Sequence, residues 1–199
     1  SSLQECESWI ENEDHEIYKF SAKNFNFFKE DGAENLVMFS YSDKLFYLGQ
    51  WFCQLWGESL GKDGLGQLPI VARGASDQHS LLQLFHQGFN NTHYHFINVE
   101  SSDPSFKINK SESELLSGYS IADLQRFQAE ATAQSLREQE RPVSRISIDT
   151  VNLENMTRLM MFYMFVTIIT AELLDVNPFG QPGVERGKVL TWNKIKKEE

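Results

Sequence analysis

The chain is poor in cysteine and in long apolar runs. Cys6 and Cys53 are its only cysteines, which are too few for a disulfide framework and indicate a reducing compartment such as the cytoplasm. The longest apolar run, Leu159–Ala171, is shorter than the roughly twenty apolar residues that cross a bilayer. It therefore predicts a buried core helix, and no membrane is expected as a partner.

Basic residues are also scarce. The sequence has 18 lysines and arginines against 28 aspartates and glutamates, which gives a formal net charge of −10. Such a chain repels nucleic acids and anionic membrane surfaces, so neither is an expected partner. Phosphate-binding P-loops, dinucleotide fingerprints and Ser-His-Asp arrangements are absent as well. An anionic substrate would need a local positive site.

What the chain does contain is enough apolar side chain for one domain: 41% of its 199 residues are hydrophobic and 13% are aromatic. Strands are expected at residues 36–39, 94–99 and 143–148, and residues 69–72 are expected to form another strand or an extended entry. Helices are expected at residues 9–30, 42–58, 76–87, 121–141 and 152–176, with loops at 57–66 and 101–113. This alternation predicts an α/β fold, a three-layer α/β/α sandwich with a mostly parallel sheet.

Polar residues at the helix starts predict N-caps, namely Ser42 or Asp43, Ser76 and Asn152. After the last of these helices the chain turns through Asn177-Pro-Phe-Gly-Gln, and Pro182 suits the first position of a new helix because its missing N–H costs nothing there. A turn of this composition can present functional groups.

Gln54 and Glu58 are the first candidate pair. They are four residues apart and share one face of a helix, and the glycine-rich segment that follows lets a substrate approach closely. A carboxylate in that position can act as a general base. The alternative is a solvated glutamate at a helix end, and the residues alone leave both interpretations open.

His79 and Lys188 are two further candidates. His79 lies early in the helix expected after Ser76, where the positive helix end favours the neutral imidazole that can shuttle a proton. Lys188 could contact a phosphate or a hydroxyl group. The simpler alternatives are an ordinary histidine and a helix ion pair between Lys188 and Glu185, three residues before it.

The remaining histidines favour structural roles. His93 and His95 alternate on a strand and share a face, but no third ligand has a supporting spacing, so they favour a polar strand face over a metal site. His86 is interpreted as an ordinary helical residue.

Three separated segments resemble, in the same order, the glucose-6-phosphate isomerase (phosphoglucose isomerase) family. They run from Tyr41-Ser-Asp-Lys to Glu58-Ser-Leu-Gly-Lys-Asp-Gly, from Gly74-Ala-Ser-Asp-Gln-His79 to Leu84, and over Gln181-Pro-Gly-Val-Glu-Arg-Gly-Lys188. The last segment is similar to the family's C-terminal signature of a Gln, then Gly-Val-Glu, two further residues and a Lys. Gly180 departs from the family, which usually has Asp or Asn before this Gln.

The resemblance implies roles for the candidate residues. Glu58 would be the base that moves a proton between C1 and C2 of open-chain glucose 6-phosphate or fructose 6-phosphate through an enediol(ate). His79 and Lys188 would assist opening of the sugar ring, and Gln54 and Gln181 would help to hold the substrate. The family needs no metal and no organic cofactor, so none is expected.

The resemblance also implies that residues 1–199 are the second, C-terminal sugar-isomerase domain of a longer two-domain enzyme, with residues 177–199 as its C-terminal turn and helix. The Ser/Thr-rich loops that bind the phosphate in the family, and its Gly-Gly-Arg signature, are not found here. Family members are homodimers that donate the histidine across the subunit boundary. The chain alone is therefore expected to be inactive or nearly so. A non-catalytic module that binds phosphosugars or other proteins is the open alternative.

Overall fold

The computed structural model describes residues 2–101, 107–108 and 114–196. At the centre of this described part lies one sheet of parallel strands in the order β2-β1-β3-β4. Its strands are β1 (Asn35–Ser40), β2 (Leu68–Arg73), β3 (Thr92–Val99) and β4 (Val143–Ile148). Each of them falls on one of the four segments expected from the sequence.

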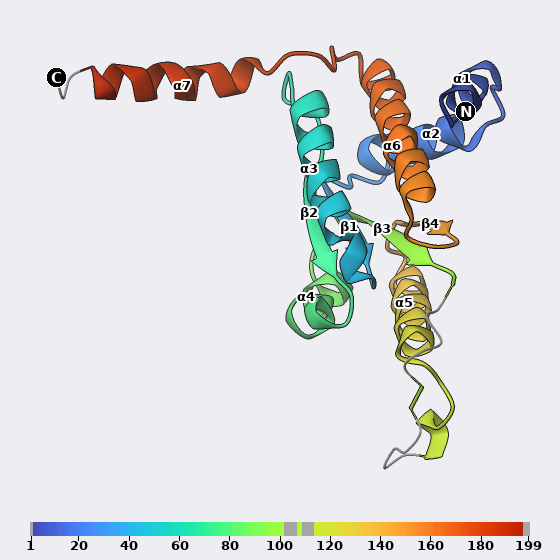
Figure 1. Cartoon of the computed structure of the whole chain (residues 1–199). Coiled ribbons are helices and arrows are strands. Elements are labelled where there is room, and N and C mark those ends of the chain that lie inside the picture. Colours follow the sequence, from blue (N-terminus) through green and yellow to red (C-terminus); the bar gives the residue numbers. More distant parts are fainter. Residues whose placement is uncertain (1, 102–106, 109–113, 197–199) are drawn as a thin grey trace.

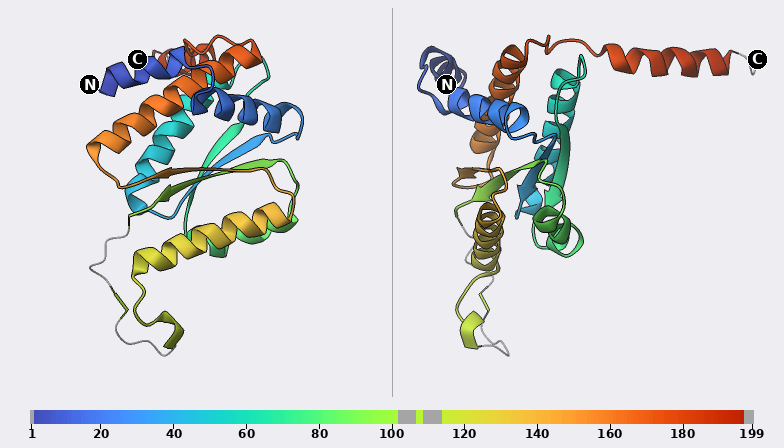
Figure 2. Two further views of the ribbon diagram at one scale, coloured as in Figure 1. Left: turned by 90° about the vertical axis from the view of Figure 1, so that its right-hand side faces the viewer. Right: turned by 180° about the vertical axis from the view of Figure 1, so that it is seen from behind.

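Helices cover both faces of this sheet, as Figures 1 and 2 show. One face carries α2 (Glu16–Lys29), α3 (Phe46–Leu60) and α6 (Leu153–Leu174), with α1 (Ser2–Glu11) packed on α6. The other face carries α4 (Ser76–Gln87) and α5 (Ile121–Glu138). The remaining described helices are the short 3-10 helices η1 (Asp43–Leu45) and η2 (Glu114–Leu116) and the C-terminal α7 (Pro182–Ile195). The predicted three-layer sandwich is confirmed.

The central strands β1 and β3 are buried on both faces. In β1, Leu36 and Met38 belong to the core beneath α3 and α6, whereas Val37 and Phe39 belong to the core beneath α4 and α5. Strands that are covered on both faces read as continuous apolar runs. This double burial is why a four-residue apolar segment was enough to predict β1.

The helix expected over residues 9–30 is wrong, because the chain forms two helices there. α1 ends at Glu11 and α2 begins at Glu16. Between them His15 has an extended backbone, and its Nδ1 accepts a hydrogen bond from the Ile17 N–H at 3.3 Å. Histidine is not among the usual N-cap residues, so the apolar spacing on either side gave no signal of the break.

Two expected boundaries of α3 also differ from the structure. The helix begins at Phe46 after η1, and Ser42 makes no side-chain capping bond. It continues to Leu60, so residues 57–60 of the expected loop are helical. A glycine inside a helix lowers its stability by about 1 kcal/mol relative to alanine, and burial of Trp56 and Leu60 in the core offsets this cost.

Of the two other predicted N-caps, one is wrong and one is confirmed. Ser76 is the first residue of α4 rather than its cap, because Ala75 takes the N-cap position with a φ of +63°. Asn152 caps α6 as predicted, and its Oδ1 accepts a hydrogen bond from the Asn155 N–H at 2.8 Å. The loop expected at residues 101–113 lies largely outside the described residues.

α6 is the predicted core helix. Among the described helices it alone has the length and apolar composition of a candidate membrane span. Its buried side chains nevertheless belong to the fold, and it packs against α2 and α3. These buried residues are Leu159, Phe162, Tyr163, Val166, Thr167, Thr170, Ala171 and Leu174. The helix therefore serves as one wall of the core.

A chain of buried polar groups links β3, β4 and α6. Ser144 Oγ lies 2.6 Å from His93 Nε2 and 2.7 Å from His95 Nδ1, and His95 Nε2 lies 2.7 Å from Tyr163 Oη. Burial lowers the pKa of His93 well below its ordinary value and lowers the pKa of His95 to about 3. Both rings are therefore neutral in the folded protein, and their bonds to Ser144 and Tyr163 agree with the structural role inferred for them.

This chain of groups predicts acid sensitivity. Because the pKa of His95 falls from 6.5 to about 3 on folding, the unfolded protein binds more protons between these values, so the stability from neutral His95 is full above pH 6.5 and is lost as the pH falls toward 3. Between pH 7.5 and 5.5 this one group lowers the free energy of unfolding by about 1.4 kcal/mol. Urea unfolding of a His95→Gln variant at the two pH values should show a loss smaller by that amount. Equal pH dependence of the wild-type protein and the His95→Gln variant would contradict the prediction.

Candidate active site

The C-terminal end of α3 brings together the first pair of candidate residues. Gln54 and Glu58 are one turn apart on the same helix face, as expected, and the Gln54 Nε2 donates a hydrogen bond to Glu58 Oε1 at 3.2 Å. Gln54 is exposed and Glu58 is partly buried. The carboxylate thus stands at the surface, at the end of the sheet where the strands begin.

The turn after α6 supplies a third candidate residue. The side-chain amide of Gln181, 123 positions beyond Glu58, donates a short hydrogen bond to Glu58 Oε2. Both oxygens of one carboxylate therefore accept a hydrogen bond from a neutral amide. In the described part of the chain no cation forms an ion pair with Glu58. Two parts of the sequence that are far apart hold this carboxylate in one orientation.

Lys62 holds the turn in place. Its Nζ donates to the backbone oxygens of Asn177, at 2.6 Å, and Phe179, at 3.1 Å, and the Phe179 N–H donates to Asn177 Oδ1 at 2.9 Å. Sequence reasoning assigned no role to Lys62. The sequence feature that could have indicated this role is the position of Lys62, four residues after Glu58 in the same segment that resembles the family.

The backbone conformation at Gly180 accounts for the departure of this residue from the family pattern. Its φ is +76°, and a Cβ added there would meet no atom within 4 Å. The left-handed region is open to glycine, and Asn and Asp are enriched there among other residues. Glycine, Asn and Asp are therefore compatible with the same backbone at this position, and Gln181 is still presented to Glu58.

His79 lies away from this cluster. It is exposed in the first turns of α4, which follows the carboxyl end of β2. Glu58 lies at the other end of β2, because α3 runs back along the sheet before that strand begins. Six strand residues span roughly 20 Å. Within one chain His79 and Glu58 are not brought together.

Lys188 is also separate from Glu58. It lies on α7 seven positions beyond Gln181, which is about 10 Å along a helix, and α7 leads away from the body of the domain (Figure 1). Pro182 occupies the first turn of α7 as predicted. Lys188 Nζ donates to Glu185 Oε1 at 2.7 Å, which is the helix ion pair considered from the sequence.

The cluster offers acid–base chemistry at one carboxylate. An oriented carboxylate at the surface can accept a proton from a substrate carbon and return it. The neighbouring thiol is less suited to reaction, because burial raises the pKa of Cys53 to about 11. Across the described residues, no three His, Cys, Asp or Glu side chains gather as metal ligands.

Comparison with known proteins gives the family context. The family model "Phosphoglucose isomerase" matches residues 20–199. The chain is 37% identical over 169 residues to "Glucose-6-phosphate isomerase" of Rubrobacter xylanophilus, covering 82% of this chain and 39% of that protein. It is 36% identical over 191 residues to "Probable glucose-6-phosphate isomerase" of Haloarcula marismortui, covering 93% and 43%. The chain thus spans about two fifths of the length of the curated relatives it matches.

Solved structures agree with this comparison. The fold matches a crystal structure of a hypothetical protein from Thermus thermophilus with a TM-score of 0.81 and 31% identity, over 89% of this chain and 45% of that one. It also matches a glucose-6-phosphate isomerase from Chlamydia trachomatis with a TM-score of 0.79 over 92% of this chain and 39% of that one. The latter shares 21% identity and supports the fold alone.

The contacts of Lys62 make the turn testable. A Lys62→Met variant keeps the aliphatic stem but removes the ammonium donor from the carbonyls of Asn177 and Phe179. We expect residues 177–181 to gain picosecond-to-nanosecond motion, seen as lower backbone heteronuclear NOE values, while the free energy of unfolding changes by no more than about 2 kcal/mol. Lys19→Met, which removes an exposed ion pair with Glu16, is the control. Unchanged NOE values at residues 177–181 in Lys62→Met would show that the ammonium does not hold the turn.

Proposed function

The chain belongs to the phosphoglucose isomerase family, and from this premise we propose that it is the C-terminal part of an enzyme that interconverts glucose 6-phosphate and fructose 6-phosphate. The observation that carries the proposal is the carboxylate of Glu58, which accepts hydrogen bonds from Gln54 and Gln181. All three residues lie on segments that resemble the family's motifs, and the fold brings them together from two distant parts of the chain.

In this reaction Glu58 removes the proton from C2 of the open-chain aldose. The C2–H electron pair forms the C1–C2 double bond of the enediol(ate) while the carbonyl at C1 takes up negative charge or a proton. Glu58 then returns the proton to C1 while the C2 hydroxyl gives up its proton and becomes the carbonyl, and the oxygen on C1 ends as a hydroxyl, so that one proton is lost at O2 and one is gained at O1. One carboxylate serves both carbons because they are neighbours in the substrate. The amides of Gln54 and Gln181 fix the direction of its two oxygens, which favours reaction from the bound geometry.

Ring opening requires groups that this chain does not place beside its own Glu58. His79 lies at the far end of β2, so we assign it to the active site of a neighbouring subunit in a homodimer. Lys188 lies on α7, whose apolar side chains are between 46% and 62% exposed. Those side chains are Val184, Val189, Leu190, Trp192 and Ile195. Their exposure supports the packing of α7 against protein outside this chain, which would fix the position of Lys188.

The phosphate of the substrate also needs binding partners from outside this chain. The surface at Glu58 offers a carboxylate and amides, in a chain with a formal charge of −10. We assign phosphate binding to the part of the longer enzyme that precedes residues 1–199, and we assign residues 177–199 to a C-terminal turn and helix of the second domain. Localisation in the cytoplasm and independence of metal and organic cofactor belong to the same proposal.

A non-catalytic phosphosugar-binding or protein-interaction module is the second candidate. The separation of His79 and Lys188 from Glu58 favours it, because a binding module needs no assembled acid–base pair. The two functions differ in what they require of Glu58. An isomerase needs its basicity, whereas a module needs only its shape and hydrogen bonds.

A Glu58→Gln variant of the parent polypeptide tests the base. Glutamine keeps the shape of the side chain but cannot accept the proton, so kcat with fructose 6-phosphate should fall by about a hundredfold to ten-thousandfold or more, with little change in KM. Glu138→Gln is a matched control, because Gln134 donates to Glu138 across one helical turn at 2.7 Å in the same arrangement. A coupled assay measures the rate. Wild-type kcat in Glu58→Gln would place the base elsewhere, and a parent polypeptide that binds the sugar phosphate without turnover would favour the module.

The 199-residue chain assayed alone forms a second test. It lacks an assembled ring-opening group and phosphate site, so we expect its turnover of fructose 6-phosphate to lie at least about a hundredfold below that of the parent polypeptide. Both proteins are assayed at equal site concentration. Turnover by the isolated chain at the rate of the parent would contradict the division of the active site.

A further inference from the structure

A polar cavity lies at the opposite end of the sheet from Glu58. Its volume is about 330 Å³. Its lining comes from the segment after β1, from the end of β3, from the link between β4 and α6, and from one face of α5. The polar and charged side chains that matter here are Ser42, Lys44, Asn98, Gln125, Arg126 and Thr150. Small-molecule sites in proteins have volumes from about 300 Å³ upward, so the cavity is large enough for a small ligand.

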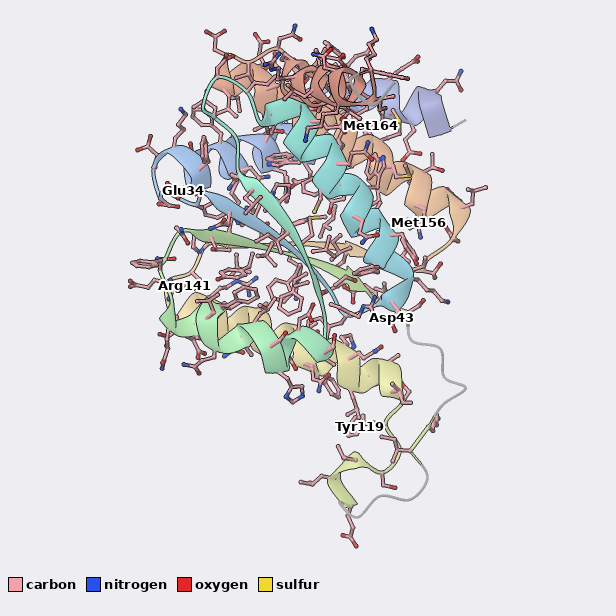
Figure 3. The ribbon with its side chains drawn as sticks, turned by 90° about the vertical axis from the view of Figure 1, so that its left-hand side faces the viewer. Glu34, Asp43, Tyr119, Arg141, Met156 and Met164 are labelled. Carbon is pink, nitrogen blue, oxygen red and sulfur yellow. The ribbon has the colours of Figure 1, made fainter. Side chains whose placement is uncertain are left out.

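The topology of the sheet places this cavity where open parallel sheets bind ligands. β1 lies between β2 and β3. The crossover after β1 leads to β2 on one side of β1, and the crossover after β2 leads to β3 on the other side of β1. The carboxyl ends of β1 and β3 therefore flank a topological switch point, and the crevice outside such a point is the general binding position in these folds. Figure 3 shows Asp43, which follows β1, at this end of the sheet, and Glu34 and Arg141, which precede β1 and β4, at the other.

The charge of the cavity is opposite to that of the chain. Its described lining contains Lys44 and Arg126 and no Asp or Glu, although the whole chain carries a formal charge of −10. Arg126 is only loosely held by acidic neighbours outside the lining, since Asp123 and Glu130 each lie 3.5 Å from its guanidinium. Asp123 is itself bound by the Ser120 hydroxyl at 2.7 Å. If the guanidinium turns to an anion, Asp123 keeps the Ser120 hydroxyl, and Glu130 is exposed to solvent.

Asn98 supplies an independent indication that this cavity binds a ligand. It is only 8% exposed, and it lines the cavity from β3. No hydrogen bond to its side-chain amide is formed by any residue in the described ranges. The amide therefore has unused donor and acceptor capacity at the cavity wall, where a ligand could bind it. The hydroxyl of Ser42 also makes no capping bond at the start of η1.

We propose that this cavity binds a small phosphorylated ligand, with the phosphate between Lys44 and Arg126 and the Asn98 amide on a hydroxyl or carbonyl group of the same molecule. The site is separate from the Glu58 cluster, because the fourteen helical positions from Lys44 to Glu58 span roughly 20 Å. It requires no catalytic step, so it is independent of the isomerase proposal. Guanidinium and ammonium groups are the usual partners of a phosphate.

Two-dimensional amide NMR of the 199-residue chain tests the site by mapping ligands directly. Inorganic phosphate and fructose 6-phosphate are titrated separately, with uncharged fructose as a third ligand. We expect saturable shifts at residues 42–44, 98–101 and 122–126 with both phosphates, and tighter binding of fructose 6-phosphate because it can also engage Asn98. Equal affinity for fructose would overturn the phosphate assignment, and no saturable shifts at these residues would overturn the site.

Substitutions separate this cavity from the rest of the surface. Arg126→Gln should weaken phosphate binding by about tenfold or more, and Lys44→Gln, at an exposed position, should weaken it several-fold. Arg137→Gln is the control, since Arg137 lies on the same helix but outside this lining. Equal affinities in Arg126→Gln and Arg137→Gln would overturn the proposal. Shifts confined to residues 54–58 and 181 would also overturn it, while supporting a sugar site at Glu58.

Discussion

The parallel pairing of β1 with β3 is the constraint from which the rest of this structure follows. A parallel sheet must be covered on both faces, because every connection between its strands crosses over one face or the other. Residues of β1 and β3 therefore alternate between two apolar cores. The polar exceptions, His93 and His95, are tolerated because Ser144 and Tyr163 supply hydrogen bonds and because burial keeps both rings neutral. Because burial in the central strand β3 holds the pKa of both histidines below its ordinary value, we expect acid to destabilise the sheet.

Parallel strands also give the domain two chemically different ends. At the end where strands begin, α3 finishes and delivers Glu58 to the turn that carries Gln181. At the end where strands finish, the polypeptide enters η1, α4 and α5, and there His79 and the cavity around Asn98 are found. The length of the strands keeps these groups apart. A site that needs both Glu58 and His79 must be completed by a second molecule, and this requirement follows from topology alone.

The sequence revealed those parts of the structure whose signals are local. β4 was predicted over residues 143–148, where it is found, because the preceding helix has to stop before Pro142 and β-branched residues follow; the helix itself ends earlier, at Glu138. The pairing of Gln54 with Glu58 followed from helical spacing. The break at His15 and the extension of α3 to Leu60 were missed, because an imidazole cap and the tertiary burial of Trp56 leave little trace in composition. The contact between Gln181 and Glu58 and the role of Lys62 depend on a chain reversal, which no local pattern specifies.

The position of Lys188 shows how the division of the proposed active site between this chain and other protein affects the proposed chemistry. Lys62 fixes the turn as far as Phe179, and Gln181 reaches Glu58 from its end. Beyond that point α7 makes its own helical hydrogen bonds and carries an exposed apolar surface. Because Lys188 pairs with Glu185 on the same helix, its charge is partly neutralised while α7 is unpartnered, and an exposed pair of this kind contributes little stability. Packing of α7 against protein outside the chain can therefore redirect the ammonium group at little cost. In the proposed reaction, Glu58 would act from the body of the domain, and Lys188 would act from a helix whose position depends on packing against other protein.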